Sequence, residues 1–174
     1  MTDDGEMVAW VDRNETLIQV IPRTLANSDP KYLHVEIADL IVDNNRSVLL
    51  QLRSHTKKVN PSLWVTTAAG HVTYGDSIEK TAHKELVEEM GFDVPRLVHL
   101  FRERVAMPSE THYCHWFLGK SSGAKIAIDP GEVDEYAWVT EADFTKFSAT
   151  HTVADRTTRV LRRFWSGEWD KLLK

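Results

Sequence analysis

Three glutamates lie close together in one short segment of the chain. Glu85, Glu88 and Glu89 are spaced i, i+3 and i+4, and on a helix this spacing brings the three carboxylates onto neighbouring surface positions. Carboxylate oxygens are the ligands that hard divalent cations such as Mg²⁺ and Mn²⁺ prefer. A cation held there would neutralise phosphate oxygens and lower the pKa of a bound water. The spacing therefore points to phosphate chemistry, although the same glutamates on a fully exposed helix would be ordinary solvated charge.

Residues 77–90 are predicted to form the helix that carries these glutamates. Asp76 or Ser77 can cap its first turn, and Gly91 is placed to end it in the left-handed conformation. A stripe of apolar residues recurs every four positions, at Ile78, Ala82, Leu86 and Met90. This stripe is the face that the helix is expected to bury.

The position of each glutamate relative to this stripe decides whether it needs a partner. At 100° per residue, Glu89 lies about 40° from the stripe's centre, Glu85 about 80° and Glu88 about 140°. Lys80 and Lys84 fall on the polar side of the helix. A carboxylate at the edge of a buried face is costly unless it is paired, so Glu85 and Glu89 are expected to hold a cation that these lysines do not supply.

The run from Gly70 to Phe92 resembles the Nudix box, a pattern of more than twenty residues. Gly70 opens it, and the matching positions further on are Glu85, Leu86, Glu88, Glu89, Gly91 and Phe92. Two positions depart from the pattern, because Asp76 stands where the family has Glu and Lys84 where it has Arg. Those two side chains are structural partners in the family. Both changes keep the charge, so the resemblance leaves room for the pair to form with an altered reach.

The resemblance implies a function and a role for each box residue. Glu85, Glu88 and Glu89 would bind Mg²⁺ or Mn²⁺, with the backbone carbonyl of Gly70 as a further ligand. Glu85 and Glu88 are the catalytic candidates, and Glu85 is the first choice for the base that takes the proton of the attacking water. The implied reaction is hydrolysis of a diphosphate linkage in a nucleoside diphosphate derivative or a related small diphosphate.

A second resemblance is to isopentenyl-diphosphate isomerase, an enzyme with the same fold. The run from Trp64 to His71 looks like the segment before that enzyme's box. His34, in the run 31–34, falls where the enzyme carries a metal-ligand histidine, and Glu110 and His112 fall where it carries two glutamates.

Three departures argue against isomerase chemistry. The isomerase needs a cysteine immediately before the Gly-His pair, and here that residue is Ala69. His112 replaces the second catalytic glutamate, and Asn27 replaces an earlier ligand histidine. Moving protons on an alkene needs opposed acid and base groups. We therefore interpret the chain as a hydrolase of the isomerase-like branch, with an isomerase-like enzyme and a non-catalytic nucleotide- or sugar-diphosphate-binding module as the alternatives.

Residues outside the three glutamates are candidates for binding the substrate or completing the metal site. The substrate-binding candidates are Arg53, Lys57, His71 and Glu132. Arginine offers a bidentate contact to phosphate, whereas Lys57 and Lys58 would otherwise be solvated loop residues. The candidates for a further metal ligand or base are Glu110, Glu132, Asp134 and Glu135. His34, His71, His112 and His115 are candidates to gather near the metal, with His71 first because it follows Gly70.

Composition bounds the class of protein. The chain has 174 residues, a net charge of −5 and a single cysteine, Cys114. These values predict a soluble cytoplasmic protein without an intrachain disulfide, acting on a small diphosphate and not on a nucleic acid polymer or a membrane. One Nudix domain is expected over 1–174, with its core at about 30–165. The N-terminal hairpin at about 7–22 is a candidate element for a homodimer.

The fold class expected is α/β, a Nudix-type α/β/α sandwich with a mixed sheet and the box helix packed against it. Strands interleaved with two or three helices predict a sheet covered on both faces. The predicted strands are 34–43, 47–53, 64–69, 96–106, 112–119 and 133–139, and further helices are expected from residue 140 and over 152–165.

Overall fold

The computed structural model describes residues 5–173 and is built on a mixed seven-stranded sheet. Its strands run in the order β5-β4-β3-β8-β7, with β6 paired to β3 and β9 paired to β4. The strands are β1 (Met7–Val11), β2 (Leu17–Pro22), β3 (His34–Val42), β4 (Val48–Arg53), β5 (Trp64–Val65), β6 (Ala68–His71), β7 (Leu97–Ala106), β8 (Thr111–Lys120) and β9 (Val133–Val139). The helices are α1 (Arg23–Ala26), α2 (Ile78–Met90), α3 (Glu141–Thr150) and α4 (Asp155–Trp165), and a short 3-10 segment, Asp170–Leu173, follows α4.

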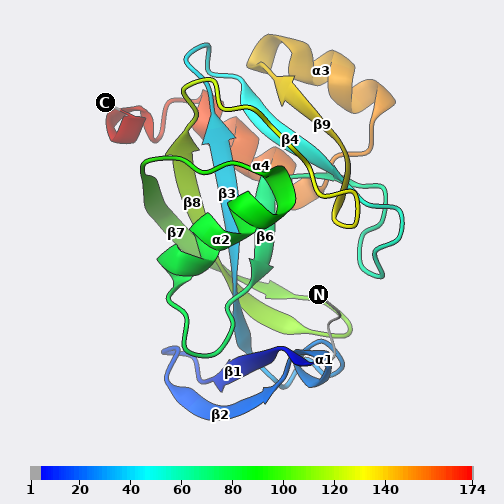
Figure 1. The fold of residues 1–174 in the computed structure, drawn as a ribbon, viewed down its shortest axis with the longest axis vertical. Helices are drawn as coiled ribbons and strands as arrows, with labels where there is room; N and C mark the ends of the chain where they lie inside the picture. The colour runs from blue at the N-terminus through cyan, green and yellow to red at the C-terminus, as the bar shows by residue number, and fades with distance from the viewer. Residues whose placement is uncertain (1–4, 174) are drawn as a thin grey trace.

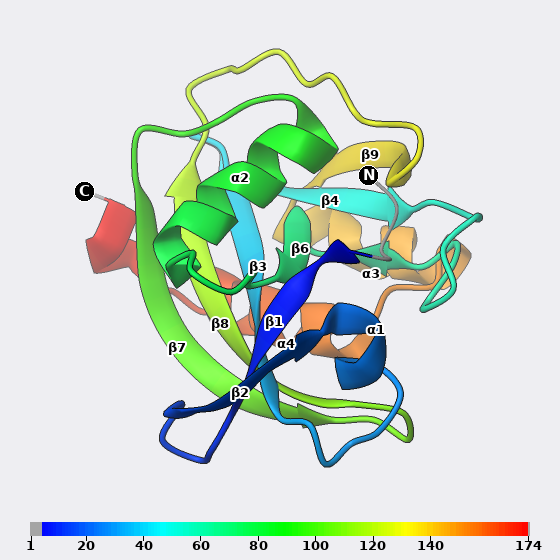
Figure 2. The same ribbon diagram turned by 60° about the horizontal axis from the view of Figure 1, so that its bottom comes forward.

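The sheet is covered on both faces, as the sequence predicts. The central strand β3 lies parallel to β8, and its side chains alternate between the two faces. Ile37 and Ile41 pack in the clusters that contain apolar residues of α2. Leu40 and Val42 pack in the cluster that contains residues of α3 and α4. Figures 1 and 2 show α2 on one side of the sheet and α4 on the other, which confirms the α/β/α sandwich.

The box helix forms as predicted. Ser77 caps α2, since its hydroxyl accepts the backbone N–H of Lys80 at 3.1 Å. Gly91 ends the helix with φ of 72°, in the left-handed region that glycine adopts without penalty. The buried side of α2 carries Ala82, Leu86 and Met90 together with the carboxylate of Glu89. The predicted apolar stripe is therefore the packed face.

The segment predicted as one strand over 64–69 forms two strands, β5 and β6, which are separated by a bend at Thr67. The backbone N–H of Thr67 donates to Asp39 O at 3.0 Å, and its hydroxyl donates to Leu49 O at 2.7 Å. The same hydroxyl accepts the N–H of Ile41 at 3.0 Å. Thr67 thus fills the fork where β3 and β4 separate, and this change of partner sends the following residues along β3 as β6.

The N-terminal hairpin of β1 and β2 forms a separate two-stranded sheet at one end of the molecule (Figure 1). Val11 N donates to Leu33 O at 2.8 Å, which joins β1 to the start of β3. At the hairpin tip, the carboxylate of Glu15 contacts the guanidinium of Arg102, and its Oε2 lies 3.0 Å from His115 Nε2. The hairpin is thereby joined to β3, β7 and β8. Among residues 5–173, no helix has the length and apolar character to cross a membrane.

Gly91 provides a test of how α2 is ended. A Cβ at this position would collide with the backbone carbonyl of Ala127, and the positive φ adds its own cost for any L-residue. We expect Gly91→Ala to lower the free energy of unfolding by roughly 1–3 kcal/mol from the backbone conformation alone, and further through the collision. Urea denaturation would measure it.

Gly123→Ala is the matched control, because Gly123 has φ of 92° but nothing within 4 Å of the added Cβ. It carries the conformational cost without the collision. Equal destabilisation by the two substitutions would show that the contact with Ala127 contributes nothing.

Candidate functional site

Gly70 and Glu85 meet where β6 passes under α2. Gly70 pairs with Ile37 on β3, and a Cβ built on Gly70 would overlap the carboxyl group of Glu85. Any side chain at position 70 would push that carboxylate away. The glycine that opens the box is therefore required by the close approach of Glu85 to the strand, and the backbone of Gly70 stays accessible beside it.

Glu89 is fixed more tightly than the other box glutamates. It is 3% exposed, and its Oε2 accepts Gln51 Nε2 at 2.7 Å and the backbone N–H of Ala69 at 3.2 Å. Burial raises the pKa of Glu89 to about 8, and the charge of Glu85 adds to the effect. Burial likewise raises the pKa of Glu85 to about 7, with Glu88 adding to it. Burial thus makes the ionised form of both carboxyl groups unfavourable.

Glu88 has a different environment from its two neighbours, in agreement with its expected place on the polar side of the helix. Its side chain is 47% exposed, and Lys84 Nζ lies 3.8 Å from its Oε2. Lys84 therefore does reach a box glutamate, because the i, i+4 spacing places both on the outer side of α2. The family's structural pair between positions 76 and 84 does not form here. Asp76 instead bonds Lys80 Nζ at 2.5 Å, one turn along the same helix.

Asp39 is a buried carboxyl beneath this group that sequence reasoning missed. It lies on β3 between Ile37 and Ile41, on the face toward α2, and is 0% exposed. Neither of its oxygens has a hydrogen-bond partner among residues 5–173. Burial raises its pKa well above the usual range, and the nearby charges of Glu89 and Glu85 raise it further. A polar residue within the apolar run 34–43 was the available signal.

A second cluster lies on the opposite face of the sheet, centred on Glu36. Its carboxylate lies 3.1 Å from His112 Nε2, 3.2 Å from His71 Nε2 and 3.8 Å from His34 Nε2. The histidines come from β8, β6 and β3, which run side by side, so His34, His71 and His112 gather as the sequence suggested. His115 does not join them, because it pairs with Ile37 and faces the α2 side.

The Glu36 cluster has the composition of a cation site. His34, Glu36, Glu110 and His112 each offer one ligand atom, and these atoms lie within 4.8 Å of one another. His34 is 0% exposed, and its Nε2 has no hydrogen-bond partner among the described residues. Burial lowers the pKa of His112 to about 4, so its imidazole is neutral at physiological pH. Imidazoles with carboxylates suit zinc, manganese or iron better than magnesium.

Residues His71 and Gly70 are consecutive but serve different faces of the sheet. Gly70 lies against Glu85, whereas the imidazole of His71 contacts Glu36 and Asn27 Oδ1, the latter at 2.9 Å. Burial lowers the pKa of His71 to about 4. The prediction that His71 shares the site of the box glutamates was therefore wrong in its geometry, because successive residues of a strand point to opposite faces.

Three predicted substrate-binding residues, Arg53, Lys57 and Glu132, have partners of their own in this structure. Lys57 Nζ lies 2.5 Å from Glu132 Oε2, and Arg53 Nε donates to Val59 O at 2.9 Å. The charges of Arg53 and Glu132 both act on the pKa of Glu89, which places them near it.

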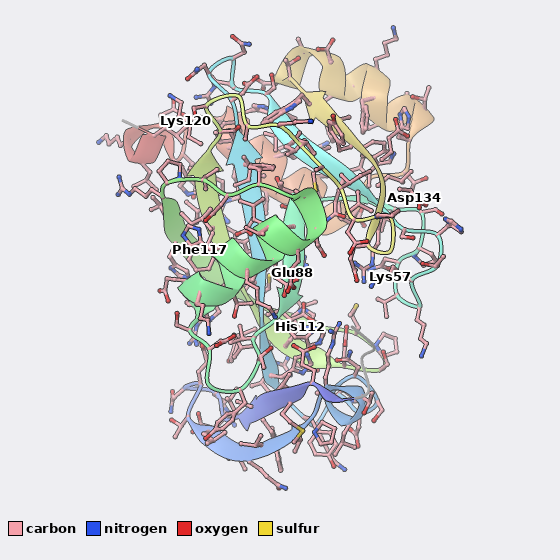
Figure 3. The ribbon with its side chains drawn as sticks, in the orientation of Figure 1. Lys57, Glu88, His112, Phe117, Lys120 and Asp134 are labelled. Carbon is pink, nitrogen blue, oxygen red and sulfur yellow. The ribbon has the colours of Figure 1, made fainter. Side chains whose placement is uncertain are left out.

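Of the remaining acidic candidates, Asp134 bonds His55 Nδ1 at 2.9 Å, while Glu135 is exposed on β9. Figure 3 shows Lys57 and Asp134 on the side of the molecule next to the end of α2, with Glu88 on the helix itself. Asp134 is therefore occupied by His55, and only Glu132 among the three late acids is placed beside the box.

The matched family defines the class of protein. The model of the NUDIX domain matches residues 33–164, and the chain belongs to this family. It lies in the isopentenyl-diphosphate isomerase-like branch of the superfamily.

Two curated relatives illustrate that placement. The chain is 37% identical to isopentenyl-diphosphate Delta-isomerase 2 of Photorhabdus laumondii over 111 residues, 62% of this chain and 62% of that protein. It is 33% identical to isopentenyl-diphosphate Delta-isomerase of Nocardia farcinica over 78% of this chain and 80% of that one.

Solved structures show the same fold at low sequence identity. A crystal structure from Deinococcus radiodurans has a TM-score of 0.71 and 16% identity, covering 91% of this chain and 98% of the other. A MutT protein from Methanosarcina mazei gives 0.66 and 20%, covering 80% and 96%. The NUDIX domain of Shewanella oneidensis NrtR, solved with ADP ribose, gives 0.64 and 15%, covering 90% and 98%.

The raised pKa values of Glu85 and Glu89 predict how stability depends on pH. A carboxyl whose pKa is higher in the folded protein stabilises the fold fully below its unfolded pKa near 4.5, and that contribution is lost as pH rises through about 7 to 8. The metal-free protein should therefore lose stability between pH 5 and 8.5, by about 1.4 kcal/mol for each unit of pKa shift at most.

Glu89→Gln should flatten this dependence, because the amide cannot ionise. Urea unfolding across the pH range would measure the slope, and Glu79→Gln on the exposed first turn of α2 is the matched control. An unchanged slope in Glu89→Gln would contradict the assignment of that titration.

Proposed function

We propose that this protein is a divalent-cation-dependent hydrolase that cleaves the diphosphate linkage of a small nucleoside diphosphate derivative or related diphosphate. The observation that carries the proposal is the set of box carboxylates. Glu85 and Glu89 are held against β6 at the edge of the buried face, with raised pKa values and, among residues 5–173, no cationic side chain within ion-pair distance. A cation is the partner that this arrangement lacks.

Mg²⁺ or Mn²⁺ at Glu85, Glu88, Glu89 and the Gly70 carbonyl would neutralise the diphosphate oxygens and lower the pKa of a bound water. Glu85 is our candidate for accepting the proton of that water, because its carboxyl group lies against Gly70, whose carbonyl is a proposed ligand of the same cation. Glu89 is fixed by Gln51 and Ala69, so it serves as the rigid member of the set. Glu88 stays at the open side of the helix, with Lys84 beside it.

Lys57 and Glu132 fit a role in binding the substrate's phosphates. The two side chains neutralise each other across the loop that precedes β5 and the turn that precedes β9. A phosphate oxygen competes with a carboxylate for a lysine ammonium. Substrate binding would therefore draw Lys57 from Glu132 and leave that carboxylate beside Glu89.

The second candidate function is isomerisation of an isoprenoid diphosphate, and the names of the curated relatives favour it. The residues of this chain argue against it. Ala69 stands on β6 beside Ala38, where a thiol would be needed. Cys114 lies on the same face of the sheet but is 0% exposed, and burial raises its pKa to about 12, so it does not replace that thiol.

The Glu36 cluster is a proposed second cation site, distinct in chemistry from the box. Its imidazoles favour a transition metal, whereas the box offers oxygen ligands only. The buried, unpaired Cys114 supports a reducing, cytoplasmic setting for the protein. The N-terminal hairpin is kept as a proposed dimer element, because Leu17 and Ile18 on β2 are about half exposed.

The test is a substrate screen with a matched pair of variants. Nucleoside triphosphates, sugar nucleotides, dinucleoside polyphosphates and isoprenoid diphosphates would be scored for phosphate, nucleotide or isomer products. We expect hydrolysis that chelation abolishes and Mg²⁺ restores, and we expect Glu85→Gln to lower kcat by roughly 10²- to 10⁴-fold with the fold intact.

Glu79→Gln, a charge-matched change on the same helix, should leave turnover unchanged. Undiminished hydrolysis by folded Glu85→Gln protein would remove Glu85 as the base. Isomer formation without release of phosphate would establish the second function instead.

A further inference from the structure

Arg156 points from α4 toward the Glu36 cluster. It lies in the first turn of the helix, and its Nη1 is 3.4 Å from His112 Nε2. Its guanidinium carbon lies 5.5 Å from the centre of the Trp116 ring. Trp116 and His112 are both on β8 and face the same side of the sheet. The guanidinium is thus half-buried between α4 and the sheet, directly beside the cluster.

Two other arginines of α4 have a carboxylate partner, whereas Arg156 has none among residues 5–173. Arg159 lies 3.1 Å from Glu103, and Arg163 lies 2.6 Å from Glu168. No carboxylate among residues 5–173 lies within ion-pair distance of Arg156, although it is less exposed than Arg159, whose side chain is 64% exposed. A guanidinium has five N–H donors, and one long contact to an imidazole leaves most of them for another group.

The charge of Arg156 is unfavourable for a bare cation at the cluster. Its Nη1 lies 3.4 Å from His112 Nε2, and His112 is one of the residues that would hold such a cation. A cation bound there would be repelled by the guanidinium. An anion placed between that cation and the guanidinium would be attracted by both, and anion–guanidinium hydrogen bonds are among the strong ones.

The two sites lie on opposite faces of the sheet but share the strand β6, which pairs with β3 alone among the strands of residues 5–173 and so has a free edge. Glu85 lies against Gly70, and Glu36 lies 3.2 Å from the imidazole of His71. These two β6 residues are consecutive, so their Cα atoms are about 3.8 Å apart. A diphosphate held at the box can therefore carry its linked group around the free edge of β6 toward the cluster.

We propose that Arg156 binds a second anionic group of the substrate, a phosphate or a carboxylate, on the moiety linked to the diphosphate. This inference rests on the proposed binding of a diphosphate at the box. It makes Arg156 a specificity-determining residue and favours substrates with a charged far end. An isoprenoid tail would instead meet a guanidinium, imidazoles and two carboxylates, which is an unfavourable setting for hydrocarbon.

Binding of matched ligand pairs tests the proposal without requiring turnover. Coenzyme A and dephospho-coenzyme A differ by one phosphate, and UDP-glucuronate and UDP-glucose differ by a carboxylate. Affinities would be measured by calorimetry with Mg²⁺ in Glu85→Gln protein, alone and combined with Arg156→Met, Arg156→Lys or Arg159→Met. Because every protein shares the Glu85→Gln background, its own effect cancels, and a separate assay of the native protein reports whether hydrolysis occurs.

We expect the charged member of at least one pair to bind roughly 10- to 100-fold more tightly in the background protein, as a charge-assisted hydrogen bond would give. The pair that shows it identifies phosphate or carboxylate. Arg156→Met should abolish the preference, Arg156→Lys should restore part of it, and Arg159→Met should leave it intact. Thermal melting checks that each variant is folded, with Arg156→Gln as a substitute for an unfolded methionine variant.

Two results would overturn the proposal: no preference in the background protein, or a preference that survives in folded Arg156→Met or Arg156→Gln. Failure of the proposed hydrolysis has a different signature. In that case the native protein releases no phosphate or nucleotide, while the binding preference and its loss in Arg156→Met remain.

Discussion

The rest of the site depends on one constraint: the buried Glu89 and the half-buried Glu85 lie against β6, and no cationic side chain of residues 5–173 is within ion-pair distance of either. Glu89 is enclosed by Gln51 and the Ala69 amide, and Glu85 occupies the space that a side chain on Gly70 would fill. Two hydrogen bonds do not offset the loss of water around closely spaced carboxylates. Their pKa values are therefore raised, and near neutral pH both carboxyl groups carry protons that a bound cation would displace.

The sheet separates two kinds of polar chemistry by its alternation. On the α2 side the groups are carboxyls, including the buried Asp39. On the α4 side they are imidazoles around Glu36, with Arg156 at their edge. The strand β6 supplies a residue to each side, since Gly70 faces one and His71 the other. Thr67 makes this possible, because its hydrogen bonds to both sides of the fork direct β6 along β3.

Local patterns predicted a large part of this structure. The helix, its Ser77 cap, its Gly91 end and the burial order of Glu89, Glu85 and Glu88 follow from a period of 3.6 residues and from glycine's conformational freedom. The sandwich followed from the order of strands and helices and from the resemblance of the box. These features depend on residues that are close in the sequence, so they can be predicted from local sequence patterns.

What the sequence did not predict depends on contacts between distant segments. Glu36 becomes the centre of a cluster only because β3 lies between β6 and β8. Asp39 is a polar residue flanked by apolar residues in a strand, and its closeness to Glu85 and Glu89 arises only because α2 packs over that strand. The resemblance left room for an Asp76–Lys84 pair, but side-chain reach on α2 favours Lys80 and Glu88 as partners. Strand pairing and side-chain reach determine these contacts, and neither can be predicted from the residue spacing within one segment.

The most direct test is the number of protons released when Mg²⁺ binds. With the pKa of Glu85 at about 7 and that of Glu89 at about 8, both carboxyls carry much of their proton near neutral pH. A cation that takes their place must displace those protons. Calorimetric titration at pH 7 in buffers of different ionisation enthalpy should show about one to two protons released per Mg²⁺ bound. Tight binding of Mg²⁺ with no proton release would contradict the claim that buried, protonated glutamates form the cation site.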